Sequence, residues 1–512
     1  MKEIVFYGDD AFFYDFPDKV DIYYAKPTIE PEKDINAVID SALQNPINSP
    51  KIEDIITPES MISVCFDDIS VPLPPMKSDV RAVAAQHVIS ILRGIGVKEE
   101  NINFICATGL HRKCKPKELK HILGKKIYRK YKAQIINHDA EDKSNLITLA
   151  TSSKGYKIEI NRMAAQSDLI IYLNISFTPL NGGWKSIIVG LGSYNTIIPH
   201  HSPEMLKKGT FMDPESSQLH KIIWEMGDLI KEKLNLFTIE MVINNNFYRG
   251  IYEKMYRPLK SKIQKPPLWR RMLFSIFRAF PKSVKAYVRK NLKAGYQLID
   301  VFAGDIEDAH KKSMELMNRQ LNVEISQQYD ILIYGVPNLT PYNVGSEMNP
   351  LLLHTLVSGY LFNMHQGDSP LKEDGTLIIL NPAYEKFDTT QHPSYRDFYY
   401  DILSNKPDIF NLKQIEHEYL HNEEYISKYK NEYAYHPVHA PIVYYWGIRG
   451  LLNIGNVIVA GAKNKNVLDI FGFEYAKDLD DALGKAQSKY QKECSIAYFC
   501  IPPLFVAKLE TK

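Results

Sequence analysis

The chain has 512 residues, of which 45% are apolar and 24% are charged, and this composition is typical of globular proteins rather than of collagens or disordered chains. So long a chain exceeds what one hydrophobic core organises, and we expect two or three domains. The N-terminal residues have neither the basic start nor the apolar core of a signal peptide, and no apolar run is long enough to cross a bilayer, so we expect a cytoplasmic protein.

Cysteine and charge usage add two constraints. The five cysteines are odd in number and form no close pair with metal-ligand spacing, which favours a reducing compartment over a disulfide framework. The net charge is +2, but residues 249–293 contain 14 Lys or Arg and a single acid, Glu253. This segment therefore carries +13 and the remainder −11, so a basic insertion interrupts an acidic body.

Four short apolar runs in the first part of the chain predict buried strands, at 61–67, 102–108, 133–139 and 168–175. Apolar residues at helical spacing occupy 80–96, which ends on glycine, and 116–124 repeats the pattern. Continuous apolar strands that alternate with helices indicate a parallel sheet covered on both faces.

A second set of strands begins at 329–337 and continues at 375–382, 456–462 and 495–503. The sequence therefore predicts an α/β fold of two domains, with mostly parallel sheets flanked by helices and the active site in the cleft between them. We place an N-terminal cofactor-binding domain at 1–248 and a C-terminal domain at 296–512, whose last strand can return to the N-terminal domain.

Residues 249–295 form the basic helical insertion. They separate two strand-like runs, 239–250 and 296–305, that would otherwise make a hairpin. Within 266–295, seven apolar side chains from Leu268 to Phe280 fall on one helical face, and Ser283 can cap a second helix. The insertion either packs on its own chain or a partner protomer, or it docks on anionic lipid or covers an anionic ligand.

Polar side chains follow three consecutive strands of the first predicted sheet. FDDISVPLPP (66–75) places two carboxylates after a strand, ATGLHRKCKP (107–116) places His111 and Arg112 after the next, and NHDAED (137–142) follows the third. Ligands of α/β sheets bind at the carboxyl ends of strands, so these groups indicate one crevice. His111 can be a general base there or a structural histidine.

The stretch NGGWKSIIVGLGSYNTIIPHH (181–201) has the residues of a cofactor loop. Gly182 and Gly183 allow a ligand to approach the backbone, and Lys185 with Ser186 adds donors suited to phosphate. The Lys185 amine is also a nucleophile, and His201 offers an imidazole ligand for nickel, copper or zinc. Taken alone, a glycine turn followed by lysine is more often a solvated loop than a cofactor site.

Several motifs in the same order resemble the nickel-pincer-nucleotide-dependent lactate racemase family. They run through nearly the whole chain: 35–55, DDISVPLPP, ATGLHR, HDAED, GGWKSIIVGLGSYNTIIPHH, VFAGDIEDAH (301–310) and DDALGKAQSKYQ (480–491). This resemblance identifies the chain as a divergent homologue.

The resemblance implies a cofactor, a pyridinium-3-thioamide-5-thiocarboxylic acid mononucleotide that holds nickel in a pincer. Its tether would be Lys185, its metal ligand His201 and its nucleotide-seating aspartate Asp68, with Gly182, Gly183 and Ser186 in the binding loop. His111 matches a family base that takes the proton of the substrate hydroxyl while hydride passes to the cofactor. The return of hydride to the opposite face inverts the carbon.

The chain departs from the family pattern at substrate positions. A second family histidine, ten residues before the tether, is Ile175 here, and a family arginine after the first strand is Val71. Near the substrate carboxylate the chain offers Asn349 but no lysine. These departures favour another alcohol, larger or uncharged, unless the basic insertion supplies the missing cations.

A rival motif lies at 417–421, where HEYLH matches the HExxH pattern of zinc hydrolases. No HxxGxxH continuation, which would supply a third zinc ligand, follows this motif. The surrounding stretch is strongly polar, which favours a solvated helix. HPVHAP (436–441) can add a loop near the cleft.

We therefore predict a nickel-dependent racemase or epimerase of a 2-hydroxy acid or a related hydroxy compound. Its partners would be the small-molecule substrate and the cofactor-synthesis enzymes, with no nucleic acid, and with an oligomer and weak membrane contact through 266–295 left open. The alternative is a protein without this chemistry that binds a phosphate-bearing ligand or an anionic membrane surface. A zinc hydrolase is the third possibility.

Overall fold

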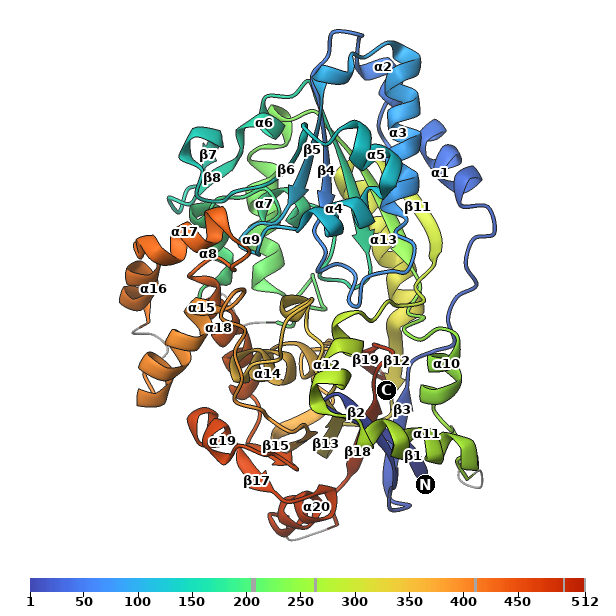
Figure 1. The fold of residues 1–512 in the computed structure, drawn as a ribbon, viewed down its shortest axis with the longest axis vertical. Coiled ribbons are helices and arrows are strands. Elements are labelled where there is room, and N and C mark those ends of the chain that lie inside the picture. Colours follow the sequence, from blue (N-terminus) through green and yellow to red (C-terminus); the bar gives the residue numbers. More distant parts are fainter. Residues whose placement is uncertain (204–208, 262–264, 409–411, 491–492, 511–512) are drawn as a thin grey trace.

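The structure, a computed structural model, describes residues 1–203, 209–261, 265–408, 412–490 and 493–510. Two six-stranded sheets dominate it, one in the upper half and one in the lower half of Figure 1. Helices flank both sheets, and the predicted α/β fold class is confirmed.

The upper sheet is mostly parallel, and its centre consists of the strands predicted from apolar runs. Only β11 runs antiparallel, against β10. The strand order is β11 (Leu298–Gly304), β10 (Leu236–Ile243), β9 (Leu169–Ser176), β4 (Ile62–Asp67), β5 (Ile102–Ala107) and β6 (Ile135–Asn137).

Helices cover both faces of the upper sheet because successive side chains of a strand point to opposite faces. Alternate residues of β9 pack in one core with α3 (Arg81–Ile95) and in another with α7 (Lys185–Ile188) and α9 (Gln218–Asp228). The other helices of this half are α1 (Ile35–Gln44), α2 (Ile52–Ile55), α4 (Pro116–Ile122), α5 (Gly124–Lys130), α6 (Arg162–Ala165), α8 (Tyr194–His201) and α13 (Ile306–Leu321).

The lower sheet is parallel throughout. Its order is β17 (Glu474–Ala476), β16 (Asn456–Ala460), β15 (Leu371–Leu380), β13 (Tyr329–Gly335), β18 (Ile496–Cys500) and β3 (Val20–Tyr24). Its helices are α14 (Pro350–His354), α15 (Pro393–Asp397), α16 (Lys413–Leu420), α17 (Glu423–Asn431), α18 (His439–Leu451), α19 (Lys465–Phe471) and α20 (Leu479–Ser488).

Three small sheets complete the structure, two of them local hairpins and one that connects distant parts of the chain. β1 (Lys2–Tyr7) pairs with β2 (Asp10–Asp15), and β7 (Leu146–Thr151) pairs with β8 (Lys157–Asn161). The last strand, β19 (Val506–Leu509), lies between β12 (Asn322–Ile325) and β14 (His365–Gln366), so it does not join the upper sheet. The N-terminal β3 lies in the lower sheet. The predicted boundaries 1–248, 249–295 and 296–512 assign this strand to the first domain. Those boundaries stay a prediction.

The predicted hairpin is present, because β10 and β11 are antiparallel neighbours, and the basic insertion lies between them. It contains α10 (Ile251–Tyr256), α11 (Leu268–Ala279) and α12 (Lys282–Lys290), near β1 and β2 in Figure 1. The prediction of Ser283 as a cap was wrong, since α12 already begins at Lys282 after Pro281, without a side-chain cap. Among the described residues, no helix combines the length and the apolarity that a bilayer crossing requires.

Candidate active site

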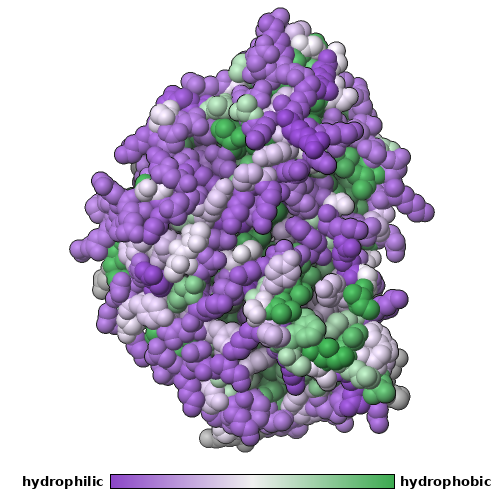
Figure 2. Space-filling view, viewed as in Figure 1, coloured by the Kyte–Doolittle hydropathy of each residue, from purple (hydrophilic) through white to green (hydrophobic). Residues whose placement is uncertain are grey.

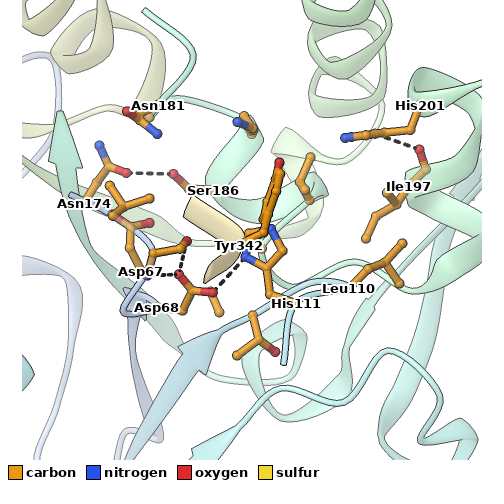
Figure 3. Close-up of a pocket in the computed structure, with 18 of the residues that line it drawn as sticks. Asp67, Asp68, Leu110, His111, Asn174, Asn181, Ser186, Ile197, His201 and Tyr342 are labelled. Atoms are coloured by element: carbon orange, nitrogen blue, oxygen red, sulfur yellow. Dashed lines mark hydrogen bonds and ion pairs between the residues drawn. The ribbon is translucent and has the colours of Figure 1, made fainter. Parts of the chain in front are cut away.

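A cavity of about 110 Å³ lies between the two halves of the molecule. The carboxyl ends of β4, β5 and β9 and the 181–201 stretch line it from above, and Tyr342 and His439 line it from the lower half. Figure 3 shows the labelled side chains converging on this space. Asp68, His111, Gly182, Lys185, Ser186 and His201, six of the predicted site residues, all lie on its wall.

Buried Asp68 pairs with partly exposed His111 and orients its imidazole. The Asp68 carboxylate lies 2.8 Å from Nδ1 of His111 and also accepts hydrogen bonds from the backbone and hydroxyl of Ser70. Burial opposes the charge on Asp68, but His111 and these hydrogen bonds outweigh it and lower the pKa of the carboxyl. A carboxylate on Nδ1 leaves Nε2 as the basic nitrogen and stabilises the imidazolium that forms when it accepts a proton.

Arg112, next to His111, holds the two halves of the molecule together. Its guanidinium donates to Glu118 in the upper half at 2.9 Å, and to the side chain of Gln391 and the carbonyl of Val344 in the lower half. It is 3% exposed, so these bonds are protected from water. Arg112 therefore holds the two halves of the molecule at a fixed spacing, and its guanidinium does not line the cavity.

Lys185 carries a buried amine without a carboxylate partner among the described residues. Its Nζ donates to the backbone carbonyl of Leu180 at 2.8 Å, and the side chain lines the cavity. Burial lowers the pKa of this amine to about 8, against a smaller opposing effect of Asp67. About a tenth of the amine is therefore unprotonated and nucleophilic at pH 7, far more than for an ordinary lysine.

Asp67 lies beside the amine but does not neutralise it. Its carboxylate accepts hydrogen bonds from the Tyr172 hydroxyl at 3.1 Å and from the backbone of Ile175 at 2.7 Å. Burial raises the pKa of Asp67 to about 6, although Arg81 favours its charged form. Of the two carboxylates that end β4, Asp67 thus bonds to the neighbouring strand β9, and Asp68 faces the imidazole of His111.

His201 ends α8 and presents an imidazole nitrogen to the cavity (Figure 3). Its Nδ1 lies 3.3 Å from the carbonyl of Ile197 and 2.8 Å from Nδ1 of His200. Only a protonated Nδ1 can donate to that carbonyl, so Nε2 keeps its lone pair. Burial, followed by the charge of Lys185, lowers the pKa of His201 to about 3, so the imidazole is a neutral metal ligand at physiological pH.

The glycine turn before Lys185 is closed around the buried side chains of Glu240 and His310 and does not open to a ligand at Gly183. The Gly183 amide donates to Glu240 at 2.8 Å, and His310 lies 3.0 Å from the same carboxylate. A Cβ on Gly182 would meet Glu240 and His310 at 2.8 Å, and one on Gly183 would meet the His310 ring. This packing therefore requires glycine, with its positive φ and no side chain, at both positions. Gly182 still borders the cavity.

Sequence analysis missed the two groups that the lower half contributes. His439, at the start of α18, lies 5.4 Å from His111 and 4.7 Å from Tyr342 between ring centroids. The Tyr395 hydroxyl bonds to its Nδ1. The HPVHAP stretch marked this loop as a neighbour of the cleft, but only the fold brings it to His111. Tyr342 follows β13 in a stretch without a recognisable signal.

A second cavity of about 200 Å³ adjoins the first and is largely apolar. The two share Lys185, His111, His201 and Tyr342 on their common wall. Its remaining wall includes Leu73, Phe177, Met212, Leu356, Met364 and Trp446. Among the described residues, Lys185 is the one lysine or arginine on either wall, so the insertion does not supply the cations that the sequence led us to seek there.

The positions that depart from the family pattern have different surroundings. Val71 lines both cavities, whereas Ile175 is buried in the core and lines neither. Asn349 also lies outside them and caps α14 through the backbone of Leu352. The cavity is bordered at the end of β9 by Asn174 instead, which accepts a hydrogen bond from Ser186.

The HEYLH motif lies on α16, where His417, Glu418 and His421 are exposed, as a solvated helix predicts. None of the three lines either cavity of the cleft. Within the described ranges, no group of three or more His, Cys, Asp or Glu side chains is arranged to hold a metal ion.

Comparison with known proteins agrees with the resemblance carried by the motifs. Residues 7–213 match the lactate racemase N-terminal domain. The lactate racemase of Thermoanaerobacterium thermosaccharolyticum is 22% identical over 346 residues, which are 67% of this chain and 64% of that protein. The lactate racemase of Lactiplantibacillus plantarum is 28% identical over 172 residues, 33% of this chain and 38% of that protein. The matched regions thus span less than two thirds of either relative.

The fold is similar to that of solved structures over almost the whole chain. The lactate racemase apoprotein from Thermoanaerobacterium thermosaccharolyticum superposes with a TM-score of 0.64 at 20% identity, covering 99% of this chain and 100% of that one. A Thermotoga maritima protein has a TM-score of 0.50 at 15% identity, with 93% and 97% covered. At these identities the likeness concerns the fold.

The buried amine predicts a stability change that depends on pH. An unfolded lysine has a pKa of about 10.4, so protonation of Lys185 opposes folding fully below pH 8 and ceases to do so above about pH 10.4. Lys185→Met should therefore stabilise the protein at pH 7 by up to about 3 kcal/mol, and by much less at pH 10. Urea unfolding at both pH values measures this, with Lys125→Met on the exposed face of α5 as the control. An equal effect of Lys185→Met at both pH values would contradict the assignment.

Proposed function

We propose that this chain, whose residues 7–213 match the lactate racemase N-terminal domain, racemises or epimerises a hydroxy compound with a nickel-pincer nucleotide bound to Lys185. One observation carries this proposal: a nucleophilic amine and a neutral imidazole, from Lys185 and His201, face the same cavity. Neither has a carboxylate partner among the described residues.

The residues present fit such a group. Lys185 has a lowered pKa and a single backbone acceptor, which suits an amine that forms a covalent bond. His201 keeps the Nε2 lone pair, and the Ile197 carbonyl fixes its tautomer, as the second hydrogen bond of a metal-bound histidine does. A single protein ligand is sufficient when the cofactor itself supplies the other ligands of the metal.

The bound group would supply a hydride acceptor next to the substrate carbon. The chain's own residues would move the proton of the substrate hydroxyl. His111 accepts it at Nε2, since Nδ1 is bonded to Asp68, and the carboxylate stabilises the charge that develops on the ring. When the carbonyl carbon is reduced again on the same face, this imidazolium returns the proton and the starting configuration is restored.

Inversion requires a proton donor and acceptor for each of two substrate orientations, and we assign the second role to His439. It lies beside His111 on the cavity wall, and burial followed by the charges of His111 and His201 lowers its pKa well below the ordinary value. Nδ1–H can donate to the Tyr395 hydroxyl, which leaves the Nε2 lone pair of His439 to accept a proton. His439 would thus replace the family histidine whose position is occupied by Ile175.

The apolar cavity would receive the body of the substrate. Once Lys185 is acylated, neither cavity wall has a cation among the described residues, so a carboxylate would lack an ion pair. Apolar side chains such as Leu356, Met364 and Trp446 instead bury hydrocarbon. We therefore favour a hydroxy compound with a sizeable apolar substituent over lactate.

The tether and the metal site are tested without an activity assay. Protein co-expressed with the cofactor-synthesis enzymes should show an added mass that peptide mapping locates on Lys185, and about one nickel per chain. Lys185→Arg should lose both, because a guanidinium is not a comparable nucleophile. An unmodified mass with no nickel in the wild-type chain would overturn the proposal.

The role of His439 is tested by replacing it with glutamine, which keeps a polar side chain but cannot exchange protons. We expect kcat for racemisation to fall on the order of a hundredfold or more, with the mass adduct and nickel content unchanged. His436→Gln is the matched control, since His436 is a buried neighbour that pairs with Glu141 outside both cavities. Retained kcat in the His439 variant would remove it from the mechanism.

Substrate preference is tested with chiral hydroxy compounds of increasing side-chain length. Each buried methylene contributes about 0.8 kcal/mol, so kcat/KM should rise by about fourfold per added carbon until the cavity is filled. Met364→Trp should reverse the order by occupying the space. A constant preference for lactate in both proteins would contradict the assignment of the cavity.

A further inference from the structure

The basic insertion exposes a concentrated apolar surface. Of the thirteen large apolar side chains that are exposed in the described part of the chain, eight lie between residues 251 and 287. Leu268 and Tyr287 are each 69% exposed and Met272 is 56% exposed. Figure 2 shows a green, hydrophobic area at the lower right, over the region of α11 and α12. Isolated exposed apolar residues are ordinary, but a contiguous group marks an interaction site.

This surface is not needed to hold the insertion on the molecule. The opposite side of α11 already packs through Phe274, whose ring lies 5.2 Å from Phe13 of β2 and 5.5 Å from Tyr256 of α10. Arg270 is buried on the same side and donates to the carbonyls of Met255 and Arg257. The apolar side chains of α11 are therefore of two kinds: Phe274 packs against the molecule, whereas others such as Leu268 and Met272 are exposed.

The cations of α12 are likewise divided. Lys285 pairs with Asp10 at 2.7 Å, and Arg289 pairs with Asp9 at 2.8 Å and with Glu347 at 3.2 Å. These inner cations hold the insertion on β1–β2 and on the lower half. The predicted packing of the insertion on its own chain is thus confirmed.

A second set of cations remains exposed around the apolar side chains. It includes Lys254, Arg257, Lys265, Arg271, Arg278 and Lys282, against the single acid Glu253. Arg278 and Lys282 lie over the rings of Phe12 and Tyr384, which fixes two of these charges at the edge of the surface. We name the exposed apolar and basic side chains of 251–287 the insertion surface.

We propose that the insertion surface docks on an anionic lipid bilayer. An apolar helix face flanked by Lys and Arg is the pattern of interfacial helices, in which the apolar side chains enter the acyl boundary and the cations contact lipid phosphates. A second copy of the chain would bring two such basic surfaces face to face, and the like charges would oppose association. Charge complementarity thus selects the bilayer.

A bilayer is also consistent with the space beneath the insertion. A cavity of about 80 Å³ lies under it, lined by Tyr252, Tyr256 and Phe277. This cavity shares Phe247, Leu339 and Pro502 with the apolar cavity beside Lys185. The membrane-docked face would therefore lie on the side of the molecule where the cavity under the insertion adjoins the apolar cavity of the cleft. The docking itself does not depend on the chemistry proposed for that cleft.

Vesicle sedimentation with the full chain tests the docking. We expect binding to vesicles of phosphatidylcholine with about one third phosphatidylglycerol, and at least tenfold weaker binding to phosphatidylcholine alone. Raising the salt from 0.1 to 0.5 M should weaken it strongly, because the Debye length falls below about 5 Å. Lys265→Gln/Arg271→Gln and Met272→Gln/Ile276→Gln should each reduce binding to the anionic vesicles at least tenfold.

Two controls keep the test decisive. Met163→Gln/Leu229→Gln changes exposed apolar residues elsewhere on the surface and should bind like the wild type. Thermal unfolding of each variant confirms that it is folded, which we expect because all the substituted side chains are exposed. Absent binding, equal binding to uncharged vesicles, or full binding by the Met272/Ile276 variant would overturn the proposal. So would a stable dimer that this variant dissociates, since the occupant would then be a second copy.

Discussion

The structure around the cleft depends on keeping an amine in a buried space without a charged partner. Lys185 lies on a short helix whose position is fixed by its neighbours: the Trp184 indole donates to Glu307, and its ring fills the space beside Gly227 that a Cβ would otherwise enter. The turn before it is held by Glu240 and His310. These contacts keep the amine in the cavity although burial disfavours its charge.

The site is assembled from both halves of the chain, and neither half holds it alone. The upper half supplies Lys185, the His111–Asp68 pair and His201, whereas the lower half supplies Tyr342 and His439. Arg112 bonds across the boundary to Gln391 and Val344, so the spacing between the halves is set one residue from the imidazole. Arg112, although it is next to His111, therefore serves the fold and adds no second cation to the cavity beside Lys185.

The sequence alone predicted the parts of the site that follow directly from strands. Apolar runs marked the strands of both sheets, and carboxyl ends of parallel strands meet, so Asp68 and His111 were expected together. His439, Glu240 and His310 could not be placed this way, because they reach the site through contacts between residues distant along the chain. For the glycine turn, the pattern suggested access for a ligand, while the structure shows packing against Glu240. The sequence left open whether the insertion's cations reach the substrate, and the structure shows that Asp9, Asp10 and Glu347 hold the inner ones elsewhere.

The central claim is that one bound group connects Lys185 and His201 across the cavity. Nickel K-edge X-ray absorption of the loaded protein tests it most directly, by comparing the wild-type chain with His201→Gln. The account predicts one imidazole nitrogen among the wild-type nickel ligands, and its loss in the variant while the mass adduct on Lys185 persists. Identical spectra of the two proteins would contradict the account, since the metal would then be held without His201.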